Sequence, residues 1–258
     1  MALREFLLKF FAPEGKYDIT LFSVWHILYI AVILGVIFST ALYLKNKPQK
    51  TKNKALSIYA LTVITLYIAD FFIMPLSEGD NAIDIDKLPF HFCTAMGVLV
   101  PFVQFNRRFA RVKDAVCCLG LVTSLMYITY PGSALGGIPP FCYKVIQTFM
   151  FHGCLMGWGI LCLTTGDVVL RFKKLWKVLV LMIATILWGT LGSHVYSTET
   201  HIYDWCFVRG EMFSFVPKLL MPLAVRGAVF GMCTVITGIY VTAKRLLAKG
   251  SEKKPITV

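Results

Sequence analysis

Charged residues are scarce in this chain. They make up 16% of its 258 residues, whereas apolar residues make up 57% and the mean hydropathy is +0.69. A soluble domain of this length needs a larger polar surface, so the composition excludes an ordinary water-soluble protein and indicates an integral membrane protein. Acidic residues are the scarcer charge, with 14 Asp and Glu against 26 Lys and Arg.

The formal net charge of +12 does not indicate a nucleic-acid partner. The basic residues lie in short runs between apolar segments rather than in one large patch, which is typical of membrane topology signals. We therefore expect membrane phospholipids as partners and no nucleic acid.

Metal-binding signatures are also missing. The eight cysteines include no CxxC pair, and none of the five histidines belongs to an HExxH or zinc-finger spacing. We expect no metal site and no cofactor. Most cysteines fall in apolar segments as small apolar filler, although Cys142 and Cys206 could pair if their membrane face is oxidising.

Long apolar segments predict an all-α, polytopic membrane fold. A helix needs about 20 apolar residues to cross a hydrocarbon core of about 30 Å. The seven predicted transmembrane helices cover 20–44, 55–76, 88–106, 114–131, 140–166, 174–196 and 218–243. They form one transmembrane domain, 20–245, between an N-terminal interfacial amphipathic segment, 1–19, and a basic cytoplasmic tail, 246–258.

The loops predict how these helices are oriented. Most basic residues lie in 45–54, 107–113, 167–177 and the tail from Lys244. By the positive-inside rule these segments face the cytoplasm, which places the N-terminus outside and the C-terminus inside. We therefore expect a multi-pass protein of the cell membrane.

Ionisable side chains gather in the outer half of the predicted helices. At a rise of about 1.5 Å per residue, those at comparable depths are His26, Asp70, His91, His152, His194 and Arg226. Such groups are costly in lipid and usually face a protein interior or a wet cavity, so they predict a polar pocket that opens outward. Alternatively, His26 and His194 could reach lipid headgroups, and Asp70 and Arg226 could form a structural ion pair.

The segment LPFHFCTAMGVLVP, 88–101, opens the third predicted helix with unusual residues for lipid contact. In a regular helix His91 and Thr94 share one face, whereas His91 and Cys93 point to nearly opposite faces. Thr94 is then the better partner of His91. Pro89 could instead leave His91 outside the helix, which would restore Cys93 as a partner.

His152 is predicted near the membrane midplane in the fifth helix. Imidazole titrates near neutral pH, so His152 is a suitable general base if it lines a wet pocket. Gln147 precedes it on the same helix and could orient a substrate carbonyl.

Three motifs carry a family resemblance: LPFHFC at 88–93, YPG at 130–132 and Q-x-F-x-x-H-G at 147–153. With them the chain resembles the YwaF-type family of bacterial integral membrane proteins, which is distantly related to a eukaryotic membrane acyltransferase of ether phospholipids. The resemblance implies acyl chemistry on lipids in the bacterial cytoplasmic membrane, with His152 as the catalytic histidine. It places the acyltransferase's cysteine at Phe90, which cannot act as a nucleophile.

Two functions can use the same outer pocket. The first is a membrane-embedded lipid acyltransferase or ester hydrolase. Its expected catalytic residues are His152, His91, Thr94 and Cys93. Its expected substrate-binding residues are Gln147, His26, Asp70, Arg226 and His194. The second is a non-catalytic binding protein or transporter for a lipid or another small molecule, although no inverted repeat supports a transporter.

Overall fold

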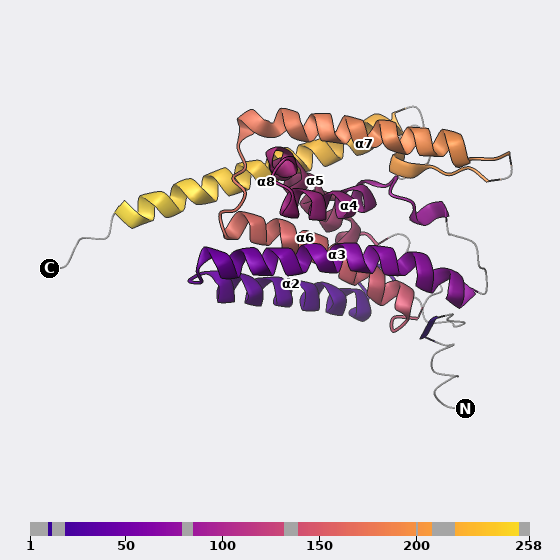
Figure 1. Ribbon diagram of the computed structural model, residues 1–258, viewed down its shortest axis with the longest axis horizontal. Coiled ribbons are helices and arrows are strands. Elements are labelled where there is room, and N and C mark those ends of the chain that lie inside the picture. Colours follow the sequence, from indigo (N-terminus) through magenta and orange to yellow (C-terminus); the bar gives the residue numbers. More distant parts are fainter. Residues whose placement is uncertain are drawn as a thin grey trace.

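The computed structural model describes residues 10–11, 19–78, 85–131, 139–199, 201–207 and 220–252. Within these ranges the chain forms seven α-helices and several short 3-10 turns, with no strand (Figure 1). The helices are α2 (Val24–Leu44), α3 (Gln49–Glu78), α4 (Phe92–Phe105), α5 (Lys113–Thr129), α6 (Tyr143–Thr164), α7 (Leu175–Tyr196) and α8 (Met221–Glu252). The prediction of an all-α fold is confirmed.

Six of these helices are long and apolar enough to cross a membrane, namely all except α4. They coincide with six of the seven predicted segments. The largest differences are at the ends of α3, which begins at Gln49, and of α8, which continues to Glu252, because both helices extend through polar residues beyond their apolar parts. The chain is therefore a multi-pass membrane protein.

The predicted length of the third transmembrane helix is wrong. A helix was expected over 88–106, but α4 has only 14 residues and spans about 21 Å, less than the roughly 30 Å of a hydrocarbon core. His91 caps α4 in an extended conformation (φ −78°, ψ 154°). Pro89 disfavours a helical conformation only of Leu88, and the extended backbone at His91 sets the start of α4 at Phe92.

The centre of the bundle is formed by α5 and α6. Every residue from Asp114 to Ser124 in α5 is buried. Close packing depends on small residues, as at Gly97, where an added Cβ would lie 2.7 Å from the Phe151 ring. By contrast, α2 buries only His26, Ile37 and Leu44, so most of its surface is left for lipid.

Two of the basic linkers meet at one end of the bundle. Lys113 forms an ion pair of 2.6 Å with Asp167, and the Lys177 ammonium donates to the Arg111 carbonyl oxygen at 2.6 Å. Figure 1 shows the α2–α3 turn, the α6–α7 connection and the C-terminal half of α8 gathered at one end of the molecule. We call the end that carries these connections the basic end. The predicted interfacial segment, 1–19, lies outside the described residues except for 10–11 and 19.

Candidate functional site

His152 lies in the buried centre of α6 with its two ring nitrogens in different states. Nδ1 lies 2.8 Å from the carbonyl oxygen of Thr148, one turn earlier. Because a carbonyl can only accept, we assign the proton to Nδ1 and a lone pair to Nε2. Nε2 is buried and has no hydrogen-bond partner among the described residues.

The Tyr127 ring holds the His152 imidazole in its orientation. The two rings are stacked, with centroids 3.7 Å apart and planes inclined by 6°. The Phe151 ring contacts the same imidazole edge-on, at 5.0 Å between centroids. A fixed ring with a free lone pair is what a general base requires.

His91 brings a second imidazole to this region from the start of α4. Positive charges on His91 and His152 would repel one another, so the two rings share one electrostatic environment. His91 also interacts with the carboxylate of Asp204, in the loop after α7, and with the ammonium of Lys87. His91 and His152 are therefore close enough for their charges to interact.

Cys93 and Thr94 differ in how free their protons are. The Thr94 hydroxyl donates to the carbonyl oxygen of His91 at 3.1 Å, so its proton is engaged by the backbone. Because His91 caps α4 instead of lying in its first turn, the objection that Cys93 would point away from it does not apply. Cys93 is half-buried and packs against the core that contains Phe151, the neighbour of His152. Of the two, only Thr94 has its proton engaged in a hydrogen bond that the structure describes.

Phe90 anchors the segment that leads to His91. It is 6% exposed, and its ring centroid lies 4.6 Å from that of Trp205 and 5.0 Å from that of Trp188. Gly192 leaves room for it, since a Cβ there would lie 2.6 Å from the Phe90 ring. The Cys206 thiol donates to the Phe90 carbonyl oxygen at 3.1 Å. Burial raises the pKa of this thiol to about 12, and the Phe90 carbonyl oxygen engages its proton.

Asp70 pairs with Lys87, so the predicted pairing with Arg226 is wrong. The Lys87 ammonium lies 2.9 Å from Asp70 Oδ2, and the Tyr67 hydroxyl donates to the Lys87 carbonyl oxygen at 2.8 Å. Arg226 Nε, on α8, is buried without a hydrogen-bond partner in the part of the chain that the structure describes. Similar depth indicated that Asp70 and Arg226 could meet, but depth does not fix which way each helix is rotated.

The Asp70–Lys87 pair predicts a measurable coupling. Replacing Lys87 by methionine leaves a buried carboxylate without its cation and should lower the free energy of unfolding by about 1–3 kcal/mol. The double variant Asp70→Asn/Lys87→Met should recover most of this loss, because both charges are then absent. Thermal melting of the purified variants in detergent measures the coupling. Strictly additive effects of the two substitutions would show that the pair is not coupled.

The other predicted binding residues, His26, Gln147 and His194, either hold helices together or lie on the surface. His26 is fully buried, with Nδ1 accepting from the Phe22 backbone N–H at 2.9 Å and Nε2 donating to the Ile128 carbonyl oxygen at 2.8 Å, so it joins α2 to α5. The Gln147 amide donates to the Leu66 carbonyl oxygen at 3.2 Å and thereby joins α6 to α3. His194 is exposed at the end of α7, where a lipid headgroup can reach it.

Several buried polar atoms have no hydrogen-bond partner. Among the described residues they include His152 Nε2, Asp70 Oδ1, the Tyr143 hydroxyl, Trp205 Nε1 and Arg226 Nε. Tyr143 lies close enough to Asp70 for their charges to interact. Folded proteins leave few buried polar atoms unsatisfied, and water or a ligand usually satisfies those that remain. Asp70, Tyr143 and Arg226 each lie near the end of their helix that is opposite the basic end.

Metal-ligating residues do not cluster in the described parts of the chain. No group of three or more His, Cys, Asp or Glu there has the geometry to hold a metal ion. All eight cysteines are free thiols within the described ranges, so the possible pairing of Cys142 with Cys206 is not formed.

Some residues of the site could not be selected from the sequence. Tyr127 and Thr148 act through their positions beside His152, which only the packing reveals. Lys87 could have been noticed in the sequence, because it lies directly before the 88–101 segment. Asp204 lies in the loop after α7, and its interaction with His91 depends on packing that a single sequence does not reveal.

Comparison with known families gives one match. The family model described as the TMEM164 family matches residues 21–199, which is more than half of the chain and includes α2 to α7 with His91, Cys93 and His152. The resemblance to the YwaF-type family is therefore wrong, and the bacterial cytoplasmic membrane that it implied loses its support. No curated protein and no solved structure matches the chain.

Proposed function

The chain belongs to the TMEM164 family of membrane proteins, and on the geometry around His152 we propose that it transfers or hydrolyses the acyl groups of lipids. The observation that carries this proposal is the free Nε2 of His152. This lone pair is buried within the apolar part of the bundle, on a ring that Thr148 and Tyr127 hold in place.

An ester carbonyl of a membrane lipid suits the surroundings of His152. The site lies among helices that contact lipid, so an acyl chain can enter from the bilayer without crossing water. Acyl transfer needs a base to take a proton from the attacking group and to return it to the leaving group. His152 Nε2 can perform both steps because Nδ1 already carries the proton that Thr148 holds.

Cys93 is the proposed nucleophile. In the first half-reaction His152 takes the thiol proton, the sulfur attacks the ester carbonyl carbon, and the ester oxygen leaves with that proton, which produces a thioester and a lysolipid. In the second half-reaction His152 takes a proton from water or from a lipid hydroxyl. The resulting oxygen nucleophile attacks the thioester, and the thiol regains its proton. The products are a free fatty acid or a newly acylated lipid.

His91 has a supporting role in this proposal. It lies in the same electrostatic environment as His152 and next to the carboxylate of Asp204. Burial keeps His91 neutral near neutral pH, and a neutral imidazole can still donate an N–H to the oxyanion that forms during each attack. Asp70, Tyr143 and Arg226 offer unsatisfied polar atoms for the lipid headgroup.

A trapped acyl-enzyme tests the nucleophile. Purified protein is mixed with phosphatidylcholine that carries isotope-labelled acyl chains, quenched in acid and measured as intact protein by mass spectrometry. We expect the wild-type chain to gain the mass of one acyl group and the Cys93→Ala variant to gain none.

Cys154 provides the matched control for this experiment. It is also a half-buried free thiol, but it lies on α6 rather than at the start of α4, so Cys154→Ala should retain the acyl adduct. If Cys93→Ala forms product at the wild-type rate, Cys93 is not the nucleophile, and His152 must activate water or a lipid hydroxyl directly.

A further inference from the structure

Two adjoining cavities lie at the far end of α4 from His91. One has a volume of about 620 Å³ and the other about 520 Å³, and Phe105, Asn106 and Arg107 line both. Both volumes fall within the range of about 300–1,000 Å³ that is usual for small-molecule sites. The nearest lining residue on α4 is Val98, which is seven residues or about 10 Å of helix from His91, and neither cavity is lined by His91 or His152.

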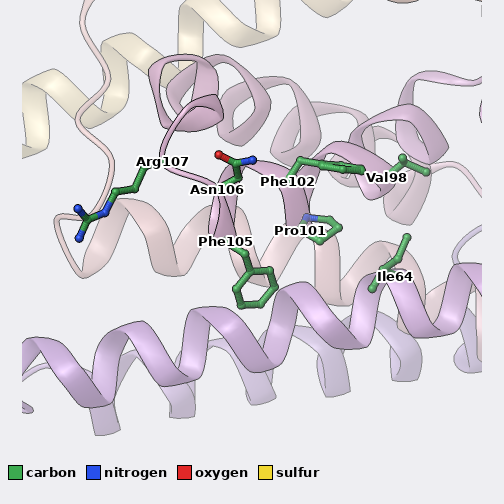
Figure 2. A pocket seen from close by; sticks show the side chains of 7 residues that line it. All are labelled: Ile64, Val98, Pro101, Phe102, Phe105, Asn106 and Arg107. Atoms are coloured by element: carbon green, nitrogen blue, oxygen red, sulfur yellow. The ribbon is translucent and has the colours of Figure 1, made fainter.

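The larger cavity is an apolar groove between α3 and α4. Ile64 lines it from α3, and Val98, Pro101, Phe102 and Phe105 line it from α4. Figure 2 shows Phe105 pointing from the end of α4 toward α3, with Pro101 beside it and Ile64 rising from α3 to face them. Phe102 and Phe105 are 50% and 53% exposed. The groove therefore opens to the outside of the bundle, where the hydrocarbon of the membrane lies.

The smaller cavity lies at the basic end and is lined mainly by polar groups. Its walls come from the α4–α5 and α6–α7 connections and carry five basic and two acidic side chains. These are Arg107, Arg111, Lys113, Lys174, Lys177, Asp114 and Asp167. The cavity therefore carries an excess of positive charge.

Only some of these cations are neutralised. Lys113 pairs with Asp167 at 2.6 Å, and Lys174 pairs with Asp114 at 2.9 Å. Arg107 and Arg111 form no ion pair with any residue that the structure describes. Figure 2 shows the Arg107 side chain extending away from the apolar groove. Two guanidinium groups are therefore left beside the polar end of the groove.

We propose that the two cavities together bind one anionic phospholipid from the membrane leaflet at the basic end. An acyl chain lies in the groove formed by Ile64, Val98 and Phe105, and the phosphate is held by Arg107 and Arg111. Arginine binds phosphate oxygens through paired N–H donors, and basic side chains beside a membrane select anionic headgroups. The apolar groove and the cationic pocket share a wall, as the two parts of a phospholipid require.

Native mass spectrometry of the purified full-length chain tests this proposal. The probes are dioleoyl phosphatidylglycerol, which is anionic, and dioleoyl phosphatidylcholine, which is net neutral. Wild-type protein should bind phosphatidylglycerol in preference. The variants Arg107→Gln and Arg111→Gln should each bind it about fivefold more weakly, and the double variant about 25-fold more weakly, while phosphatidylcholine binding should change little.

Lys50 and Lys54 provide a charge-matched control. Both are exposed at the start of α3, at the basic end, but neither lines the cavities. The double variant Lys50→Gln/Lys54→Gln removes as much charge as the double arginine variant and should retain phosphatidylglycerol binding to within about twofold. Equal losses in the two double variants would overturn the proposal, because they would reflect only the total charge.

A second pair of measurements tests the apolar part of the site. Val98→Trp fills the groove without changing any charge, and it should weaken phosphatidylglycerol binding while the melting temperature in neutral detergent is retained. Glycerol 1-phosphate, which has the phosphate without acyl chains, should not displace the lipid. Efficient displacement by glycerol 1-phosphate, or full binding by Val98→Trp, would contradict a lipid site and leave only a pocket for soluble anions.

Discussion

The variant His152→Ala should catalyse lipid acyl transfer or hydrolysis about 10²- to 10⁴-fold more slowly than wild type, because a positioned general base contributes a factor of that size to such reactions. The substitution removes the imidazole, whose Nε2 is the buried, unpaired nitrogen that we assign as the base. Release of labelled lysolipid or fatty acid from phosphatidylcholine measures the rate. The loss should appear mainly in kcat, since binding of the acyl chain does not depend on the imidazole.

Two further variants separate loss of the base from loss of the fold. His152→Gln can still donate a hydrogen bond but has no basic nitrogen, so it should fold and remain as inactive as His152→Ala. His194→Ala removes an exposed histidine at the end of α7 and should retain the wild-type rate. If His152→Gln keeps its melting temperature and its activity, His152 is not the general base.

The variant Phe90→Ala should lower the free energy of unfolding by about 3–5 kcal/mol, the usual cost of removing a buried phenylalanine ring. Phe90 packs between Trp188 and Trp205, and Gly192 leaves no side chain to fill the space. The substitution therefore opens a cavity that the neighbouring rings cannot close. Thermal melting in detergent gives the change in stability.

Phe72 on α3 is the matched control for Phe90. It is 67% exposed on a transmembrane helix, where its ring contacts lipid rather than protein, so Phe72→Ala should change stability by less than about 1 kcal/mol. The contrast should also appear in function, because Phe90 directly precedes His91. Equal shifts in melting temperature for the two variants would show that the aromatic cluster does not anchor this segment.

The transmembrane helices could be predicted from the sequence because apolar length determines whether a helix crosses a bilayer. Six segments meet this condition in the structure, and their predicted positions agree with it. The prediction of a transmembrane helix over 88–106 is wrong because hydropathy does not indicate at which residue a helix begins. The first residues of this segment are mostly apolar, but the backbone is extended at His91, so α4 begins only at Phe92.

The candidate site could be predicted only to the level of membrane depth. Depth grouped His91 with His152, whose charges are close enough to interact, and their action in one site stays a prediction. Depth also grouped His26, whose two nitrogens bind the backbone at Phe22 and Ile128, and it paired Asp70 with Arg226 instead of Lys87. These differences arise from the rotation of each helix about its axis. Rotation depends on packing across the whole bundle and leaves little trace in a single sequence.

For the cationic pocket at the basic end, the sequence identified the residues but not their arrangement. Its basic residues were recognised in the sequence, but only as signals of topology. The structure brings 107–113 and 167–177 together around one cavity and neutralises some of their charges with Asp114 and Asp167. Residues that set the orientation of a membrane protein can therefore also form a site, and only their spatial arrangement distinguishes the two roles.

The most direct measurement is mass spectrometry of lipids after wild-type protein and His152→Ala have each been incubated with a labelled phospholipid pool. Lipids that co-purify with each protein are identified first, so that bound and converted species can be told apart. We predict that wild-type protein alone produces new acylated or deacylated species. If both proteins hold the same unaltered lipid or small molecule and no product forms, the chain is a binding or transport protein, and acyl chemistry at His152 is contradicted.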